Sequence, residues 1–260
     1  GTWVEDRLTY GVERKEGAVC YIGCFSSYTY HGKGKYFCDK TLVYDGEFMN
    51  GNCHGHGSKF DESGVCIYRG EFQRGEYHGH SDHWSYGGHH GDGEFVNGLL
   101  HGFGEEKWVT KHGDHYCYLG NFEYGRSHGE GVLTKNSHTE YTGQWKDGNR
   151  HGIGQSQVYD AARERHVPHY VGEWADDREC GQGRLFRNDN EYVKGTFVNG
   201  LPHGFCTTYA GFVHSSPSLI NFPHVNEELF KDCKPVGDGF VLEDGSVAHG
   251  CIWVNGMIDM

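Results

Sequence analysis

Aromatic and small residues alternate with polar residues in short stretches along this chain. In one stretch, Tyr141, Gly143 and Trp145 are separated by the polar residues Thr142 and Gln144. Successive side chains of a β-strand point to opposite faces, so the aromatic residues share one face and the polar residues share the other. The pattern therefore predicts a half-buried β-strand, and it recurs at other positions.

Each such stretch is followed by a turn and a second strand. The turn carries an Asn-Gly or Asp-Gly dipeptide, which accepts the positive φ of a tight hairpin turn. The returning strand begins with His-Gly-x-Gly, and its glycines leave room on the inner face for aromatic rings of the same or a neighbouring hairpin. The turn dipeptides are Asn50-Gly51, Asn97-Gly98, Asp147-Gly148, Asn199-Gly200 and Asn255-Gly256.

The His-Gly dipeptide marks an internal repeat. Successive markers are 23, 24, 23, 27, 23, 29 and 23 residues apart when Cys180-Gly181 is counted among them. A fixed period of this length is typical of stacked repeats. The markers begin at His31, His54, His78, His101, His128, His151, Cys180 and His203. The clearest copies start at Tyr44, Tyr118, Tyr141 and Tyr170, and weaker copies start at Tyr21, Tyr68, Val193 and Gly91, where the expected tyrosine is missing.

The repeat predicts an all-β fold. A single hairpin cannot bury its aromatic face alone, so we expect the copies to stack into an elongated, twisted single sheet in which each hairpin contacts mainly its neighbours. The predicted organisation is an N-terminal lead-in strand or cap over residues 1–20, a repeat array of about eight copies over 21–208, an irregular insert over 209–235 and a C-terminal capping hairpin over 236–260.

The repeating frame Tyr-x-Gly-x-Trp/Phe-x-x-Gly-x-x-His-Gly-x-Gly resembles the MORN repeat (membrane occupation and recognition nexus). The resemblance extends from Tyr21 to Cys206. It implies an all-β solenoid with roles in cytoskeletal scaffolds and tethering, and in some cases self-association. Arrays of this family also occur as accessory parts of certain lipid kinases and of one class of lysine methyltransferases.

The aromatic positions of the frame are predicted to form the core of the repeats. These positions are Tyr44, Phe48, Tyr118, Phe122, Tyr141, Trp145, Tyr170 and Trp174. A single sheet has two faces, so the alternative is that part of the aromatic stripe stays open as a groove for a partner helix or strand. Edge strands offer a second surface for pairing with another chain or another copy.

The C-terminal part carries a second resemblance. Residues 228–250 contain Phe-x-x-x-x-Pro-Val-Gly-x-Gly-Phe-Val followed by a glycine-rich strand, which resembles the end of the MORN-bearing subunit of the ciliary radial spoke head. The preceding insert, from Ala210 to Lys234, departs from that pattern and breaks the period. Long irregular connections are often functional, so its aromatic residues are candidate partner contacts. They are Phe212, Phe222 and Phe230.

Charge and composition narrow the classes of partner. The formal net charge is −13, which disfavours binding to nucleic acid and to an anionic membrane surface, and no run of Lys or Arg forms a basic patch. No stretch approaches the roughly 20 apolar residues of a membrane helix, and residues 1–20 lack the apolar core of a signal peptide. We therefore expect a soluble, intracellular protein whose ten cysteines are mostly reduced.

The chain shows no pattern of a metal, cofactor or catalytic site. Most of its 20 histidines occupy the His-Gly position, where a structural role accounts for them. The pair formed by Cys20 and Cys24 lacks the second ligand pair of a zinc site. There is no nucleophile elbow and no Walker motif. A dense group of histidines is His78, His80, His83, His89 and His90.

These patterns predict a non-catalytic structural scaffold that holds partner proteins in a cytoskeletal assembly. The specific expectation is a radial spoke head of a motile cilium or flagellum, with the chain in the cytoplasm and axoneme. The expected partners are other proteins of that assembly, with self-association through a sheet edge or end. Two alternatives remain open: a regulatory array of an enzyme whose catalytic domain lies outside residues 1–260, and a membrane-tethering module that binds anionic phospholipid.

Overall fold

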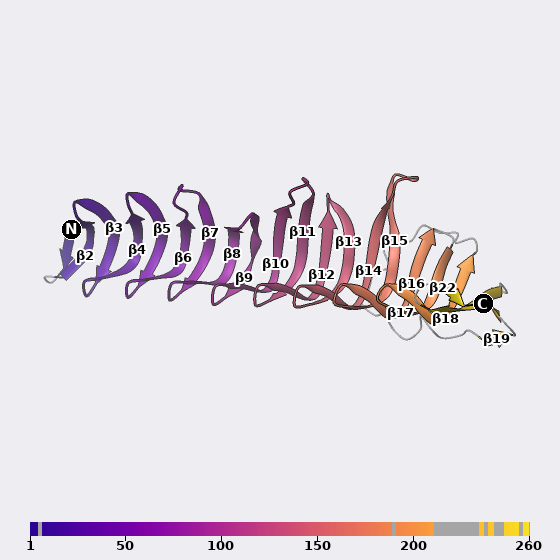
Figure 1. Ribbon diagram of the computed structural model, residues 1–260. Helices are drawn as coiled ribbons and strands as arrows, with labels where there is room; N and C mark the ends of the chain where they lie inside the picture. The colour runs from indigo at the N-terminus through magenta and orange to yellow at the C-terminus, as the bar shows by residue number, and fades with distance from the viewer. Residues whose placement is uncertain are drawn as a thin grey trace. The chain divides into compact units, whose positions relative to one another are not determined.

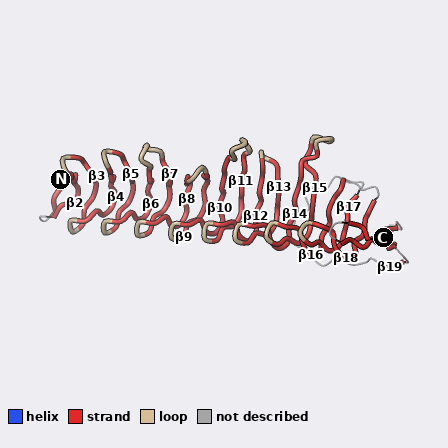
Figure 2. The backbone as a smooth tube through the Cα atoms, viewed as in Figure 1, coloured by secondary structure: helices blue, strands red, loops and turns tan. Residues whose placement is uncertain are grey.

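The computed structural model describes residues 1–4, 7–188, 191–210, 234–236, 239–241, 247–254 and 257–259. These residues form β-strands joined by turns (Figure 2). Strands make up most of the described residues, so the predicted all-β class is confirmed. The described part of the chain contains no helix, and therefore none that is long and apolar enough to cross a membrane.

The chain divides into two compact units, of which the first comprises Gly1–Ser127. Its strands are arranged side by side in chain order (Figure 1). They are β1 (Thr2–Val4), β2 (Arg7–Lys15), β3 (Ala18–Ser26), β4 (Thr29–Cys38), β5 (Thr41–Met49), β6 (Asn52–Phe60), β7 (Cys66–Gln73), β8 (Glu76–Tyr86), β9 (His89–Val96), β10 (Leu99–Val109) and β11 (His115–Glu123).

The second unit comprises His128–Met260. Its first strand, β12 (Arg126–Lys135), begins just before the division. The following strands are β13 (His138–Lys146), β14 (Asn149–Asp160), β15 (Arg165–Ala175), β16 (Arg178–Asn188), β17 (Glu191–Val198), β18 (Leu201–Ala210), β19 (Lys234–Val236), β20 (Gly239–Val241), β21 (Val247–Val254) and β22 (Met257–Asp259).

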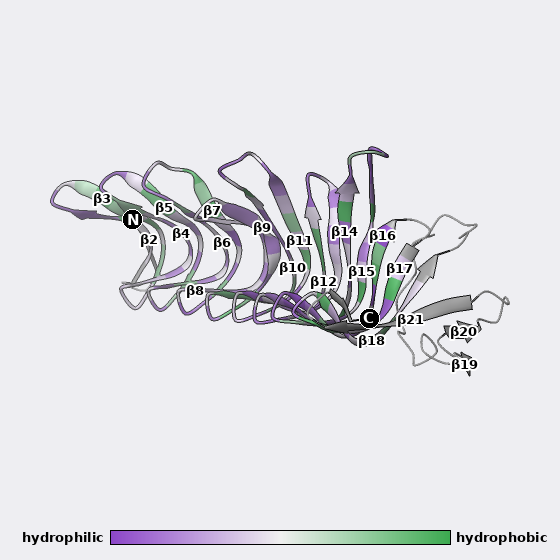
Figure 3. Cartoon of the chain, turned by 45° about the vertical axis from the view of Figure 1, so that its right-hand side comes forward, coloured by the Kyte–Doolittle hydropathy of each residue, from purple (hydrophilic) through white to green (hydrophobic). Residues whose placement is uncertain are grey.

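Within each unit the strands form an antiparallel sheet of stacked hairpins. Strands β1 to β11 pair successively in the first unit, and β12 to β18 do so in the second. Hydrophobic segments recur along the strands between polar ones (Figure 3). This arrangement confirms the prediction of stacked hairpins.

Two families of tight turns join the strands. The first lies inside each repeat, as at Asn50 and Gly51, whose φ angles are 52° and 83°. The second lies between repeats, as at Asp39 and Lys40, with φ angles of 46° and 70°. Positive φ at both central residues is typical of the turn type that matches the right-handed twist of the paired strands. The second family carries weaker turn signals and was not predicted from the sequence.

The last described strands return to the end of the array. Strand β18 pairs with β21, so that Cys206 lies opposite Cys251 and Phe205 lies opposite Ile252. Strands β19, β20, β21 and β22 also pair successively. Most of the predicted insert over 209–235 lies outside the described residues, and the predicted domain boundaries stay predictions.

Candidate interaction surface

A buried tyrosine lies at the centre of most repeats. Tyr141 is 0% exposed, and its hydroxyl donates a hydrogen bond of 2.9 Å to the backbone carbonyl of Gln144. Burial disfavours the charged phenolate, and it raises the pKa of Tyr21 to about 12. The equivalent bond, to the carbonyl three residues further on, is donated by Tyr21, Tyr44, Tyr68, Tyr118 and Tyr170.

Two glycines on paired strands make room for the ring of Tyr141. Gly143 lies opposite Gly154 in the pairing of β13 with β14. A Cβ atom on Gly154 would lie 2.5 Å from Cε2 of Tyr141 and closer still to its hydroxyl, and one on Gly143 would lie 2.8 Å from that hydroxyl. The spaces are therefore filled by the ring, as the alternation of glycine with aromatic residues predicted. The same relation places Gly34, Gly57 and Gly183 against Tyr21, Tyr44 and Tyr170.

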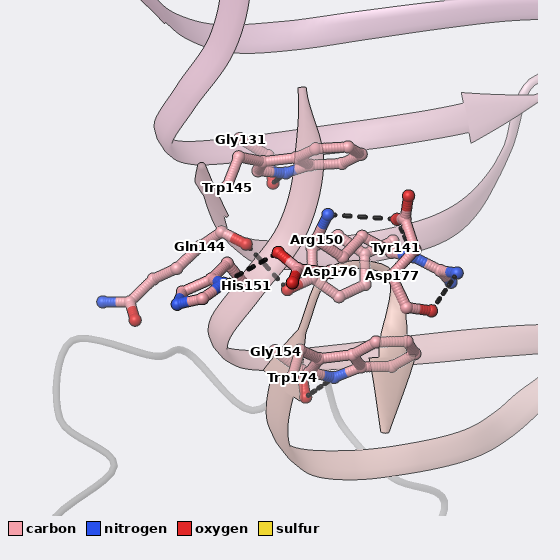
Figure 4. Close-up of polar contacts among 10 residues, drawn as sticks. All are labelled: Gly131, Tyr141, Gln144, Trp145, Arg150, His151, Gly154, Trp174, Asp176 and Asp177. Carbon is pink, nitrogen blue, oxygen red and sulfur yellow. Dashed lines mark hydrogen bonds and ion pairs between the residues drawn. The ribbon is translucent and has the colours of Figure 1, made fainter. Parts of the chain in front are cut away.

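The core tyrosines also connect consecutive repeats. The ring of Tyr141 makes edge-to-face contacts with Trp145 of its own repeat and with Trp174 of the next, both at 5.2 Å between centroids. Each indole N–H donates a 3.2 Å hydrogen bond to a backbone carbonyl, from Trp145 to Gly131 and from Trp174 to Gly154 (Figure 4). Such ring pairs contribute about 0.5–1.5 kcal/mol each beyond their burial. Equivalent contacts surround Tyr21, Tyr44, Tyr68 and Tyr170.

Backbone geometry explains the His-Gly marker. Gly152 has a φ of 62°, and the register between β13 and β14 shifts at this point to form a bulge. A left-handed residue in a bulge favours glycine. The side chain of Gln144 accepts a 3.0 Å hydrogen bond from the N–H of Ile153, which the bulge leaves out of the pairing with β13. In the next repeat, Glu173 accepts the same bond from Gln182 at 2.8 Å.

The turns of several hairpins are tied to the preceding repeat. The N–H of Asp177 donates to the carbonyl of Arg150 at 3.1 Å, and the Arg150 Nε donates to the Asp177 carboxylate at 2.9 Å (Figure 4). The Arg150 guanidinium also lies 4.4 Å from the ring centroid of Trp174. The backbone bond alone recurs from Gly51 to Tyr30, from Gly75 to Cys53, from Gly98 to Tyr77, from Gly125 to Leu100 and from Gly200 to Glu179.

The repeat that lacks its tyrosine is completed by the strand before it. Trp84 lies opposite Gly91, is 8% exposed, and packs at 6.5 Å between centroids from Phe95. A Cβ atom on Gly91 would lie 3.2 Å from the indole nitrogen of Trp84 and in collision with the carbonyl oxygen of Glu105. Trp84 therefore supplies the aromatic group in this part of the core, which the sequence did not predict.

All eight residues predicted to form the repeat core are buried. Their exposed fractions range from 0% for Tyr141 and Tyr170 to 7% for Trp145. These rings therefore do not line an open groove. The three candidate partner contacts, Phe212, Phe222 and Phe230, lie outside the described residues.

Exposed aromatic side chains lie at the ends of the hairpins instead. Tyr28 and Tyr124 occupy turns inside repeats and are 74% and 73% exposed. Tyr86, at the end of β8 beside a turn between repeats, is 85% exposed. Aromatic residues are enriched at protein interfaces. The hairpin ends are therefore the candidate interaction surface of the array.

Reactive and metal-ligating groups are dispersed over the described residues. No three of their His, Cys, Asp and Glu side chains lie close enough together to hold a metal ion. Eight of the described cysteines are free thiols, and burial raises the pKa of Cys206. His151 of the His-Gly marker lies 3.9 Å from the exposed carboxylate of Asp176 (Figure 4), which is a weak surface ion pair when the imidazole is protonated.

The model of one protein family, described as the MORN repeat, matches more than half of the chain. It matches residues 21–41, 44–65, 68–80, 92–112, 118–140, 141–157, 170–191 and 194–210.

Three curated relatives share part of this sequence. Alsin from Homo sapiens is 32% identical over 104 residues, which cover 40% of this chain and 6% of alsin. The ALS2 C-terminal-like protein from Bos taurus is 32% identical over 38% of this chain and 10% of its own length. MORN repeat-containing protein 3 from Xenopus laevis is 33% identical over 29% of this chain and 32% of its own length. The chain therefore spans a minor share of each relative.

Proposed function

Because the chain belongs to the MORN repeat family, we propose that it is a non-catalytic scaffold whose repeat array holds partner proteins. MORN repeats are generally non-catalytic modules that bind proteins or membranes. The observation that carries the proposal is the aromatic core that consecutive repeats share within each unit, as between Tyr141 and Trp174. Such a core fixes the spacing of the exposed hairpin ends, and fixed spacing is what a scaffold requires.

The proposed assembly is cytoskeletal, and its specific form is the radial spoke head of a motile cilium or flagellum. This places the chain in the cytoplasm and the axoneme. The support is the resemblance of residues 228–250 to the spoke-head subunit, together with a repeat array typical of cytoskeletal scaffolds. Other axonemal proteins are the proposed partners, with pairing between copies at a sheet edge as a further contact.

Proximity labelling in a ciliated cell tests this assignment. The chain would carry the labelling enzyme at its C-terminus, and imaging would locate the tag. We expect enrichment of spoke proteins and signal along the axoneme. Signal restricted to basal bodies, a cortical skeleton or membranes, without spoke proteins, would overturn the spoke-head assignment and leave the scaffold proposal standing.

A second candidate is an accessory or membrane-tethering module of a longer protein. The observation that favours it is that the shared segment covers only 6% of alsin, so similar repeats also serve as a small part of a large chain. The net charge of −13 opposes binding to anionic lipid. Co-sedimentation with phosphatidylserine vesicles at low and high salt tests it, and binding that salt abolishes would favour tethering over the scaffold.

A further inference from the structure

Three aromatic rings stack across neighbouring strands in the first unit. Trp108 on β10 lies opposite His89 on β9 and opposite Tyr116 on β11. The ring of Trp108 lies 5.6 Å from that of His89 and 5.3 Å from that of Tyr116, with interplanar angles of 20° and 7°. All three side chains are half-buried. We call His89, Trp108 and Tyr116 the aromatic shelf.

A carboxylate lies beside the aromatic shelf on the same face of the sheet. Glu106 and Trp108 are two residues apart on one strand, so their side chains point the same way. The Nδ1 of His89 lies 2.8 Å from Oε1 of Glu106, whose side chain is 25% exposed. Since a carboxylate only accepts hydrogen bonds, the imidazole is the donor. Glu106 also lies opposite the buried Tyr118, so the aromatic shelf lies on the same face of the sheet as the buried core.

The carboxylate of Glu106 is partly open to solvent, because its side chain is 25% exposed. On β9, the residue opposite Glu106 is Gly91, which has no side chain and over which the indole of Trp84 lies. Beyond the shelf, Tyr86 lies opposite His89 and is 85% exposed. The nearby Lys107 points to the other face of the sheet, where it pairs with Glu105 at 2.5 Å. Aromatic surface and negative charge therefore meet at one accessible place.

The chemistry of this place fits a planar cation. An arginine guanidinium stacks on aromatic rings and donates paired hydrogen bonds to a carboxylate, whereas the lysine ammonium is a compact, strongly hydrated charge. The chain shows this recognition elsewhere. Arg150 lies 4.4 Å from the ring centroid of Trp174 while its Nε donates to the Asp177 carboxylate at 2.9 Å.

We propose that the aromatic shelf and Glu106 bind an arginine side chain of a partner protein. The guanidinium lies against the exposed aromatic surface and donates to Oε2 of Glu106, while His89 retains its bond to Oε1. The net charge of −13 draws a basic segment to the chain, and the shelf selects arginine within it. This inference rests on the proposed scaffold function, because it names the partner chemistry of that scaffold.

A titration of the full chain labelled with 5-fluorotryptophan tests the proposal by ¹⁹F NMR. The probe is a short peptide of alternating glycine and arginine, and the Trp108 resonance is assigned by its loss in Trp108→Leu. We expect the Trp108 resonance to shift while those of Trp145 and Trp174 stay in place. A lysine peptide of equal charge should bind roughly threefold more weakly, and a neutral citrulline peptide should leave the Trp108 resonance unshifted.

Matched variants separate the shelf from general charge attraction. Glu106→Gln should weaken binding of the arginine peptide by roughly three- to tenfold, because it removes the charge of the side chain and keeps its shape. Asp176→Asn removes one carboxylate that is 84% exposed in the second unit, and it should leave the dissociation constant within about twofold. Equal losses in both variants, or equal affinity for the citrulline peptide, would overturn the proposal.

The proximity-labelling experiment tests this inference separately from the scaffold function. If the wild-type chain labels partner proteins and Glu106→Gln labels the same proteins to the same extent, the shelf is not the contact and the scaffold stands. If the wild-type chain labels no discrete set of proteins, the scaffold function fails, and the partner role of the shelf fails with it.

Discussion

Replacing Gly154 with alanine tests whether the tyrosine and its facing glycines hold each repeat together. The added methyl would lie 2.5 Å from Cε2 of Tyr141, far inside normal carbon–carbon contact, and the ring is 0% exposed. Overpacking of a core costs about 1–3 kcal/mol. A displaced ring also loses its hydrogen bond to Gln144, worth about 1 kcal/mol. We expect Gly154→Ala to lower the free energy of unfolding by about 2–4 kcal/mol.

Urea denaturation followed by tryptophan fluorescence measures this change, because Trp145 and Trp174 both contact Tyr141. Tyr141→Leu removes the ring that the new methyl meets. The double variant should therefore lose at least about 1 kcal/mol less than the sum of the two single losses. Thr142→Ala, on the opposite face of the strand, serves as the control and should stay within about 0.5 kcal/mol of wild type. Additive losses from Gly154→Ala and Tyr141→Leu would refute the steric explanation.

Three further predictions concern the bulge, the link between turns and the core hydroxyls. Gly152→Ala should cost about 1–2 kcal/mol in the same denaturation assay, because φ at this bulge is 62°; an unchanged midpoint would contradict the bulge geometry. Arg150→Ala should cost about 1–2 kcal/mol, because it removes a guanidinium bonded to Asp177 and stacked on Trp174; Arg150→Lys should recover less than half of that loss. The buried tyrosines favour folding below about pH 10, the ordinary pKa of a tyrosine hydroxyl, and this contribution should be lost as the pH rises through the raised pKa of Tyr21, about 12. A denaturation midpoint that stays constant between about pH 9 and pH 12 would show that these hydroxyls are not linked to folding.

The repeat frame made most of the fold predictable. The alternation of Tyr141, Gly143 and Trp145 identified the buried face, since side chains two apart on a strand share a face. The period of 23 residues identified the stacking, because one hairpin cannot bury such a face alone. The positive φ of Gly152 accounts for the marker from which the period was found.

Features that depend on strand register were not predictable. The bond from the N–H of Asp177 to the carbonyl of Arg150 joins backbone groups, which leave no sequence pattern. The sequence showed that Gly91 replaces a tyrosine, but it did not show that Trp84 supplies the ring. To predict this, one must know which residues face each other after the register shift between β8 and β9.

The aromatic shelf was not predictable for the same reason. Trp108 and Glu106 are close in sequence, but His89 and Tyr116 reach them only through pairing with two other strands. His89 belongs to a dense group of histidines in the sequence, and the structure places its ring on Trp108. The candidate contacts of the insert stay predictions, because they lie outside the described residues.

Site-specific photo-crosslinking tests the central claim, that the array is a protein-binding scaffold, most directly. A benzophenone amino acid would replace Tyr28, Tyr86 or Tyr124 in the full chain inside ciliated cells, since these side chains are 73–85% exposed. The account predicts discrete protein adducts from Tyr86, beside the aromatic shelf, and their loss when Glu106→Gln is added. An array that yields no protein adducts at any of the three positions, yet co-sediments with anionic vesicles, would contradict the scaffold and favour membrane tethering.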